Sequence, residues 1–270
     1  MDEITIEISE GASGVSVFSE DGAMPKDDTN LAVRAAKLMR FDGFDDVGVA
    51  ISIDKKIPQA AGLAGGSADA AAVMLALAST SRVEGLTAPV GAVSLSELTL
   101  LGIKLGADVP FCICTAAKAN PLLGFSGDEL AQGTLWAEGI GEKLSPLKAP
   151  RPKASVVLIK PKISVATPTV FKLLDDEPLW VPRTGPAEMF ENDLELVTPK
   201  AFPVVAEILA WLRANEVGGV SMMSGSGPTC FSYIEQDPCK PDEAKSLAAR
   251  LYSEAKKAFP EFEVFLVETL

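Results

Sequence analysis

The sequence predicts an α/β (α+β) protein of two domains, and three observations lead to this prediction. Runs of β-forming residues alternate with helix-forming runs along the whole length of 270 residues. A segment concentrated in proline and lysine, SPLKAPRPKAS, lies near the middle and is the best candidate for a domain boundary. The half that follows has its own ordered set of strands and helices. We therefore expect a first domain at residues 1–150 and a second at residues 151–270.

The first strands and the first helix are marked by local patterns. The runs ITIEIS and GVSVFS bring β-forming residues close together along the chain, so a short hairpin is expected. The run DDTNLAVRAAKLMR predicts a helix with Asp28, Thr29 or Asn30 at its N-cap. The near-alternating run DVGVAISID predicts a strand, and a glycine loop then leads into the alanine-rich helix ADAAAVMLAL.

The rest of the first half continues with shorter elements. The run SLSELTLLGIKLG predicts a helix that begins at Ser94 or Ser96 and stops at Gly106. The run ADVPFCICTAAK predicts a tight turn into a buried strand. Residues 120–132 predict a loop, after which TLWAEG and EKLSPL return the chain to strand and turn.

The second half predicts a sheet with helices on it. SVVLIK is expected to be a strand, followed by helices near 167–174 and 204–214. GGVSMM and PTCFSYI then predict two strands, residues 242–258 a helix, and EVFLVE a last strand. The order β-α-α-β-β-α-β is a split βαβ, ferredoxin-like plan with one extra helix.

Composition excludes several classes of function. The net charge of −13 argues against a nucleic-acid-binding surface, which needs a basic face. No apolar run is long enough for a membrane-spanning helix, and the start MDEITIEISE is too acidic for a signal peptide. Four cysteines without a CxxC pair, and no histidine, make a zinc site improbable and favour a reduced, cytoplasmic protein. Any acid–base chemistry therefore falls to carboxylates or lysines.

The stretch KKIPQAAGLAGGSADAAAVMLAL could hold a phosphate. It brings Gly62, Gly65 and Gly66 to the start of a helix, just before Ser67. Glycines let a ligand approach the backbone, and the first turn of a helix offers unpaired N–H groups and a positive dipole end. A glycine turn before a closely packed helix explains the same residues equally well. Neither GxxxxGK[ST] nor GxGxxG is present, so the known phosphate-loop and dinucleotide motifs are excluded.

Two further stretches contain candidate residues for substrate binding and proton transfer. SMMSGSGPTCF places Ser224, Gly225, Ser226 and Gly227 between two strands, where they could line a pocket or simply form a flexible hairpin tip. LGADVPF fixes Asp108 next to a proline, where a carboxylate could accept a proton from a substrate hydroxyl. An aspartate near a helix end is, by itself, more often a turn residue.

Taken together, these stretches resemble the GHMP kinases, which are named for galactose, homoserine, mevalonate and phosphomevalonate. Within that superfamily, GLAGGSADAAA, LGADVPF, AEGIGEKLSPL, PKISVATPTVFK and the ENDLE of residues 191–195 are similar to the 4-diphosphocytidyl-2-C-methyl-D-erythritol kinases. The resemblance implies a first, ATP-binding domain with a left-handed βαβ crossover and a ferredoxin-like second domain. It also implies ATP-dependent phosphorylation of the substrate 2-hydroxyl in non-mevalonate isoprenoid synthesis, with Mg²⁺ held mainly by ATP phosphates and water rather than by protein ligands.

The resemblance assigns residues one by one. Asp108 would deprotonate or orient the attacking hydroxyl, Thr167 would touch the methylerythritol part, and Phe171 would stack on the cytosine. The alternatives are that Thr167 caps a helix before Pro168 and that Phe171 faces the core. Gly225, Ser226 and Gly227 would complete the substrate side. The ATP site would consist of Pro58, Gly62, Leu63, Ala64, Gly65, Gly66, Ser67 and Asp69.

The sequence also departs from the family. The family begins with a strand carrying lysine and asparagine and a DGYH-type turn, and neither is present here. Without that strand we expect an exposed sheet edge and exposed apolar core surface, which favour association or instability. The protein is expected to be a monomer or homodimer. Ala64 and Ala68 stand where glycine and serine are common. Three hypotheses follow: a kinase whose true start lies upstream of Met1, a truncated and weakly active homologue that only binds nucleotide, or a kinase for another small alcohol.

Overall fold

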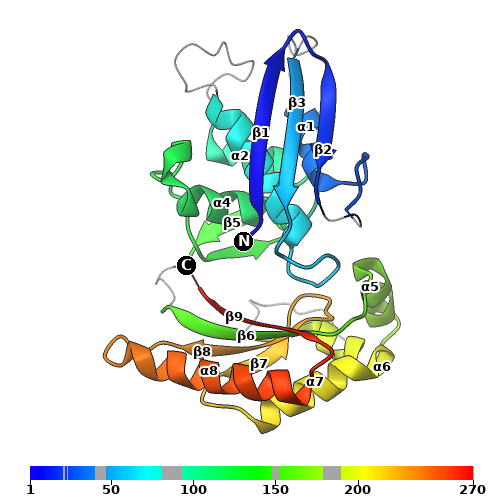
Figure 1. The fold of residues 1–270 in the computed structure, drawn as a ribbon, viewed down its shortest axis with the longest axis vertical. Coiled ribbons are helices and arrows are strands. Elements are labelled where there is room, and N and C mark those ends of the chain that lie inside the picture. The colour runs from blue at the N-terminus through cyan, green and yellow to red at the C-terminus, as the bar shows by residue number, and fades with distance from the viewer. Residues whose placement is uncertain are drawn as a thin grey trace. The chain divides into compact units, whose positions relative to one another are not determined.

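A computed structural model describes residues 1–20, 22, 24–39, 47–80, 93–147, 152–178 and 190–269. The chain divides into two compact units (Figure 1). The N-terminal unit comprises residues 1–59 and 64–150, and the C-terminal unit comprises residues 60–63 and 151–270. The segment SPLKAPRPKAS thus contains the main division, although residues 148–151 lie outside the described part. The first half of the glycine loop belongs to the C-terminal unit.

The sheet of the N-terminal unit has three strands in the order β1-β3-β2. They are β1 (Glu3–Glu10), β2 (Gly14–Phe18) and β3 (Val47–Asp54). β1 runs antiparallel to β3, with Ile6 opposite Ile51, and β2 runs parallel to β3, with Val17 also opposite Ile51. The expected hairpin between the first two strands is therefore wrong. β3 is the most deeply buried of the three strands and takes the central position, which a pattern confined to residues 4–19 cannot reveal.

The helices of this unit pack on one face of the sheet, where α1 and α2 lie against the strands (Figure 1). Asn30 caps the first helix because its side-chain oxygen accepts a hydrogen bond from the Ala32 N–H at 2.9 Å. Ser94 caps the third helix in a capping box with Glu97, and that helix ends at Gly102 rather than at Gly106. The elements are α1 (Leu31–Leu38), α2 (Gly65–Thr80), α3 (Leu95–Gly102), α4 (Val109–Ala119), the 3-10 helix η1 (Pro121–Leu123), and the paired strands β4 (Leu135–Glu138) and β5 (Lys143–Pro146).

The run after Asp108 forms helix α4, so the predicted buried strand there is wrong. Its residues VPFCICTAAKA include several β-forming types, which suggested a strand. Pro110 lies in the first turn, where its missing N–H costs nothing, and the buried Val109, Ile113 and Ala117 recur every four residues. Packing against α2 and α3 therefore outweighs local propensity.

The C-terminal unit has the predicted order of elements. Its sheet runs β7-β8-β6-β9 with every neighbouring pair antiparallel, the ferredoxin-like arrangement. Helices α7 and α8 cover one face of this sheet (Figure 1). The elements are β6 (Ala154–Lys160), α5 (Thr167–Asp175), the 3-10 helix η2 (Asp193–Leu196), α6 (Thr198–Ala201), α7 (Pro203–Ala214), β7 (Val220–Met223), β8 (Cys230–Glu235), α8 (Pro241–Ala258) and β9 (Glu263–Glu268).

Each unit has its own apolar core. Met74, Leu75 and Ile113 are fully buried in the N-terminal unit, and Ile159 and Leu212 are fully buried in the C-terminal unit. The handedness of the β2-α1-β3 connection stays a prediction. In the described residues, every helix is too short or too polar to cross a lipid bilayer.

Candidate active site

The first turn of α2 presents unpaired backbone N–H groups. The first intrahelical hydrogen bond of α2 runs from the Ala68 N–H to the Ala64 carbonyl at 2.9 Å. The N–H groups of Gly65, Gly66 and Ser67 precede it and therefore have no partner within the helix. With 16 residues, α2 also places a positive dipole end at this point. These donors suit an anion such as phosphate.

Gly65 and Gly66 are glycines for different reasons. A Cβ on Gly66 would meet only the Leu31 Cδ1 atom, at 3.6 Å, and Gly66 is exposed, so open space lies above it. A Cβ on Gly65 would lie 2.9 Å from the Ile57 Cγ2 atom and 3.2 Å from the Lys55 Nζ atom. Gly65 therefore permits close packing inside the unit, whereas the space above Gly66 is open.

Gly62 belongs to the C-terminal unit and packs on that unit's own glycine turn. Its φ is +71°, and a Cβ there would lie 2.6 Å from the Ser224 carbonyl oxygen and 2.7 Å from that of Gly227. The Ser224 hydroxyl also donates a hydrogen bond to the Gly62 carbonyl at 2.8 Å. The glycine at position 62 is thus explained by backbone packing. The predicted ATP-binding stretch is divided, with Gly62 and Leu63 in one unit and Ala64 to Ser67 in the other.

A buried charge cluster lies below the first turn of α2. The Lys55 ammonium donates to the Asp69 carboxylate at 2.8 Å and is also paired with Asp2. These three side chains are only 4–6% exposed. The other Asp2 oxygen accepts hydrogen bonds from the N–H groups of Lys56 and Ile57, at 2.6 and 2.7 Å. The cluster therefore ties the start of β1, the end of β3 and α2 together. Sequence reasoning did not find Lys55 or Asp2.

Burial changes the titration of this cluster. Burial raises the pKa of Asp69 to about 6, because hydrogen bonding and charge attraction from Lys55 offset only part of the desolvation. Burial acts on Asp2 too, but hydrogen bonds from Ile57, Lys55 and Lys56 outweigh it and hold the pKa of Asp2 below its ordinary value. Asp69 faces the interior, and its second oxygen has no hydrogen-bond partner among the described residues. Its contribution to an ATP site would be to hold Lys55 and α2 in place.

Asp108 occupies the N-cap position of α4, is exposed, and makes no capping hydrogen bond with its side chain. α4 packs against α2. Burial raises the pKa of the Cys112 thiol to about 12, with further contributions from the negative charges of Asp108 and Asp69. Asp108 is therefore carried at the start of a helix that packs against α2, whose first turn, residues 65–67, forms the candidate phosphate cradle.

The hairpin turn between β4 and β5 abuts the backbone beside Asp108. Gly141 has a φ of +104°, and a Cβ there would lie 2.2 Å from the Ala107 carbonyl oxygen. Only glycine fits this contact. Gly141 lies in AEGIGEKLSPL, one of the runs that resemble the kinase family. That resemblance is the sequence signal from which a role of Gly141 in supporting Asp108 could have been predicted.

The glycine turn of the C-terminal unit, residues 224–227, is tightly bonded. Gly225 and Gly227 have φ values of +54° and +82°, and the Gly227 N–H donates to the Ser224 carbonyl at 2.9 Å. The hydroxyls of Thr167 and Ser226 lie 2.9 Å apart and share a hydrogen bond. The structure therefore brings together four of the five predicted substrate residues: Thr167, Gly225, Ser226 and Gly227.

The two alternatives for Thr167 and Phe171, a helix cap and a core-facing ring, are not what the structure shows. Ala166 is the N-cap of α5, so Thr167 is the first helical residue and its hydroxyl is bonded to Ser226 instead. The Phe171 side chain is 52% exposed, while Val170 and Leu174 face the core. An exposed aromatic ring on a helix is available to stack on a planar base.

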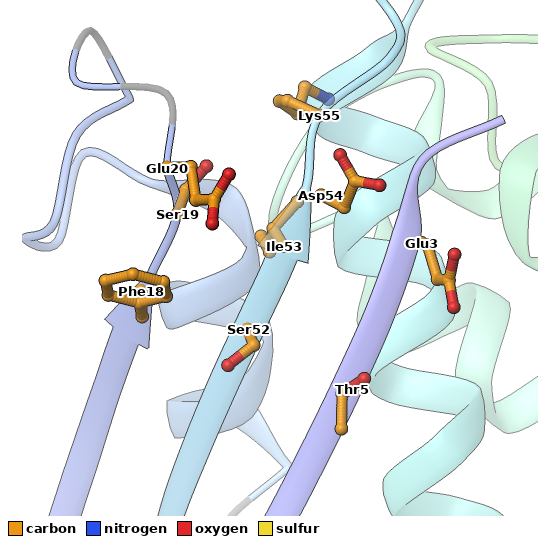
Figure 2. A pocket seen from close by; sticks show the side chains of 9 residues that line it. All are labelled: Glu3, Thr5, Phe18, Ser19, Glu20, Ser52, Ile53, Asp54 and Lys55. Carbon is orange, nitrogen blue, oxygen red and sulfur yellow. The ribbon is translucent and has the colours of Figure 1, made fainter.

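A separate hollow of about 690 Å³ lies at one end of the β1-β3-β2 sheet, and Figure 2 shows its side chains. Carboxylates of Glu3, Glu20 and Asp54 line it, together with Phe18 and Lys55. Because the Lys55 ammonium is already paired with Asp2 and Asp69, the three carboxylates would repel a triphosphate. The α2 cradle, which has N–H donors and no carboxylate among its first-turn residues, is therefore the better phosphate site in this unit.

The fold and the two glycine turns define a small-molecule kinase of the GHMP class, and comparison with known families supports this directly. The profile described as the GHMP kinases N terminal domain matches residues 30–116, and that of the GHMP kinases C terminal domain matches residues 185–260. Together these matches span more than half of the chain.

Comparison with individual proteins shows which family of GHMP kinases this chain resembles. A 4-diphosphocytidyl-2-C-methyl-D-erythritol kinase from Limosilactobacillus fermentum is 34% identical over 98% of this chain and 87% of its own. The protein of that name from Clostridium acetobutylicum is 36% identical over 95% of this chain and 84% of its own. A crystal structure of 4-(cytidine 5'-diphospho)-2C-methyl-D-erythritol kinase matches with a TM-score of 0.63 and 30% identity, covering 99% of this chain and 85% of that one. The chain belongs to the 4-diphosphocytidyl-2-C-methyl-D-erythritol kinase family.

Proposed function

We propose that this chain transfers the γ-phosphoryl group of ATP to the 2-hydroxyl of 4-diphosphocytidyl-2-C-methyl-D-erythritol. The observation that carries the proposal is the first turn of α2, with free N–H donors and open space above Gly66, in a chain of this kinase family. The product would be the 2-phosphate of the substrate, together with ADP.

The cradle would bind the phosphates of ATP. The N–H groups of Gly65, Gly66 and Ser67 would donate to phosphate oxygens, and the Ser67 hydroxyl could add a further donor. The Asp2–Lys55–Asp69 cluster would keep the turn rigid, so that the donors need not reorganise when charge develops.

Asp108 would act on the acceptor. The Asp108 carboxylate would take the proton of the 2-hydroxyl as its oxygen bonds to the γ-phosphorus, while the bond from that phosphorus to the bridging oxygen of ADP breaks. An exposed carboxylate with no capping bond is free to approach a hydroxyl. The Gly141 contact would fix the backbone from which Asp108 extends.

The C-terminal unit would recognise the acceptor. The exposed Phe171 ring would stack on the cytosine, and the bonded pair Thr167 and Ser226 would contact the methylerythritol part. Stacking on a base can contribute about 1–3 kcal/mol of binding free energy. Gly225 and Gly227 would let the backbone approach the substrate closely.

Magnesium would be held mainly by the nucleotide. In the part of the chain that the structure describes, no three cysteine or carboxylate side chains lie together as a protein metal site would require. Mg²⁺ bound to ATP phosphates and water would neutralise part of the phosphate charge.

The test is phosphoryl transfer from γ-labelled ATP to three acceptors in parallel: 4-diphosphocytidyl-2-C-methyl-D-erythritol, homoserine and mevalonate. We expect label on the first acceptor only, at the 2-oxygen, as phosphorus NMR would show. Transfer to homoserine or mevalonate instead would make this a kinase for another alcohol. ATP binding without transfer to any acceptor would leave only a nucleotide-binding protein.

A further inference from the structure

The segment ENDLE, residues 191–195, has no role in the mechanism above, yet its side chains hold the glycine turn at residues 224–227. The Asn192 amide donates hydrogen bonds to the carbonyls of Met223 at 3.0 Å and Gly225 at 2.8 Å. Its side-chain oxygen accepts from the Leu194 N–H at 3.0 Å and so caps η2. One half-buried side chain therefore connects the start of η2 to the last residue of β7 and to Gly225 within the turn.

Glu195, toward the other end of η2, contacts Met223, the residue that leads into the same turn. One of its oxygens accepts a hydrogen bond from the Met223 N–H at 2.7 Å. The other is 2.5 Å from an Arg213 guanidinium nitrogen on α7. The Glu195 side chain is 18% exposed, so this contact with Met223 is shielded from water.

These contacts determine where the backbone of the turn points. In a planar trans peptide the carbonyl of one residue and the N–H of the next point in opposite directions. The Gly225 carbonyl is directed at Asn192, so the Ser226 N–H must point away from Asn192. The Thr198 hydroxyl donates to the Ser226 carbonyl at 3.4 Å and restrains the next peptide in the same way. Gly225 is a glycine in the left-handed region and has access to other backbone conformations, of which these bonds select one.

We propose that Asn192 and Glu195 are positioning residues that hold the turn at 224–227 in the orientation required to contact the acceptor substrate. The role in turnover rests on the proposed function, whereas the role in fixing the turn stands on the hydrogen bonds alone. Neither residue touches the reacting atoms. Asn192 would act through the peptide that joins Gly225 to Ser226, and Glu195 through the Met223 backbone that leads into the turn.

Asn192 is tested by three variants. Asn192→Ala removes all its contacts, and Asn192→Asp keeps the oxygen that caps η2 while it loses both donors to the turn. Asn215→Ala is the matched control, because Asn215 is also half-buried in the C-terminal unit and donates to a helix carbonyl, that of Trp211, at 2.8 Å. We expect kcat/KM for the acceptor to fall on the order of 10²-fold in both Asn192 variants. The control should retain wild-type kinetics.

Three readouts separate positioning from general destabilisation. Thermal unfolding measures the stability that each variant loses, with a larger loss expected for Asn192→Ala, which removes three hydrogen bonds, than for Asn215→Ala, which removes one. The KM for ATP should not change in any variant. Amide NMR of the free protein should show shifted Ser226 and Gly227 resonances in the Asn192 variants only. Recovery of wild-type kinetics by Asn192→Asp would overturn the proposal, since only the cap would then matter.

Glu195 gives an independent check. Glu195→Gln keeps an acceptor for the Met223 N–H and should retain wild-type kcat/KM, whereas Glu195→Ala should lose it. Arg213→Ala, which removes only the exposed ion-pair partner, should have little effect. Equal activity of Glu195→Ala and wild type would contradict the proposal. A wild-type chain without kinase activity would contradict the proposed function instead, and the NMR comparison would still decide the role of Asn192 in holding the turn.

Discussion

Gly66 lies in the first turn of α2 with open space above it, and under the proposed function a side chain there would meet the ATP phosphates. We expect Gly66→Val to abolish ATP binding while the free energy of unfolding changes by less than about 1 kcal/mol, because a Cβ meets only Leu31 at 3.6 Å. Titration calorimetry with ATP, alongside denaturant unfolding, makes the measurement. Gly65→Val is the contrast: its Cβ meets Ile57 at 2.9 Å, and we expect it to cost about 1–3 kcal/mol of stability. Unchanged ATP affinity in Gly66→Val would refute the cradle.

Asp108 should matter for turnover more than for affinity. Asp108→Asn keeps the shape of the side chain but cannot take up a proton. We expect kcat to fall on the order of 10²–10⁴-fold with little change in the KM of the acceptor. Steady-state kinetics over a range of acceptor concentrations tests this, and wild-type turnover in the variant would remove Asp108 from the mechanism.

Ala64 carries backbone strain that a glycine would relieve. Its φ of +52° costs an alanine roughly 1–2 kcal/mol, whereas introducing glycine costs about 0.5–1 kcal/mol in chain entropy. We expect Ala64→Gly to raise the free energy of unfolding by up to about 1 kcal/mol. Ala68→Gly, four residues later inside α2, should lower it by about 1 kcal/mol. If both variants were destabilised equally in urea unfolding, strain at Ala64 would be excluded.

At the scale of elements, the Asp2–Lys55–Asp69 cluster should make stability depend on pH. Asp69 has a folded-state pKa of about 6 against an ordinary value of 3.8, so the folded state binds the extra proton between these pH values. The free energy of unfolding of the wild type, relative to Asp69→Asn, should therefore fall as pH rises from 4 to 6, by up to about 3 kcal/mol, and then level off.

Urea unfolding of both proteins from pH 4 to pH 8 makes that comparison. Both carry nearly the same set of other charged groups, with a net charge of −13 in the wild type, so the pH dependence that those groups cause largely cancels in the difference. Asp2, whose pKa is lowered, acts in the opposite direction and only below its ordinary value of 3.8. A constant difference across the range would show that Asp69 does not titrate there.

The elements that the sequence predicted correctly are those whose signal is local. Asn30 and Ser94 are identifiable as caps from neighbouring residues, and the C-terminal unit repeats strand and helix patterns at ordinary lengths. Two predictions from the sequence are wrong for the same reason. The pairing of β1 and the helical state of residues 109–119 are both decided by distant partners, β3 in one case and α2 in the other.

The candidate site shows the same contrast between residues with a local signal and residues that depend on distant partners. The glycines, Asp108 and Phe171 are identifiable because their residue types suit the chemistry or match a family motif. The supporting residues are not: Lys55 pairs with Asp69 across 14 positions, and Asn192 reaches Gly225 across 33. Hydrogen bonds between distant segments leave no periodic trace in a single sequence.

At the scale of the whole molecule, ligand binding should stabilise the fold. ATP that binds only the folded state adds about 2.7 kcal/mol to the free energy of unfolding at a free concentration one hundred times its Kd. We expect a corresponding rise in melting temperature for wild type in ATP and magnesium. Gly66→Val should show no rise, and an equal rise in both would place the nucleotide elsewhere.

The assignment of residues 60–63 to the C-terminal unit has a consequence for protein engineering. A gene fragment encoding residues 151–270 would omit the tetrapeptide whose Gly62 carbonyl accepts the Ser224 hydroxyl, and would leave that part of the surface without its backbone partner. The C-terminal unit is therefore not continuous in the sequence. A chimera that exchanges it between two homologous kinases should carry the tetrapeptide with it, and a swap made at residue 150 alone would combine a turn with a loop that was not selected to fit it.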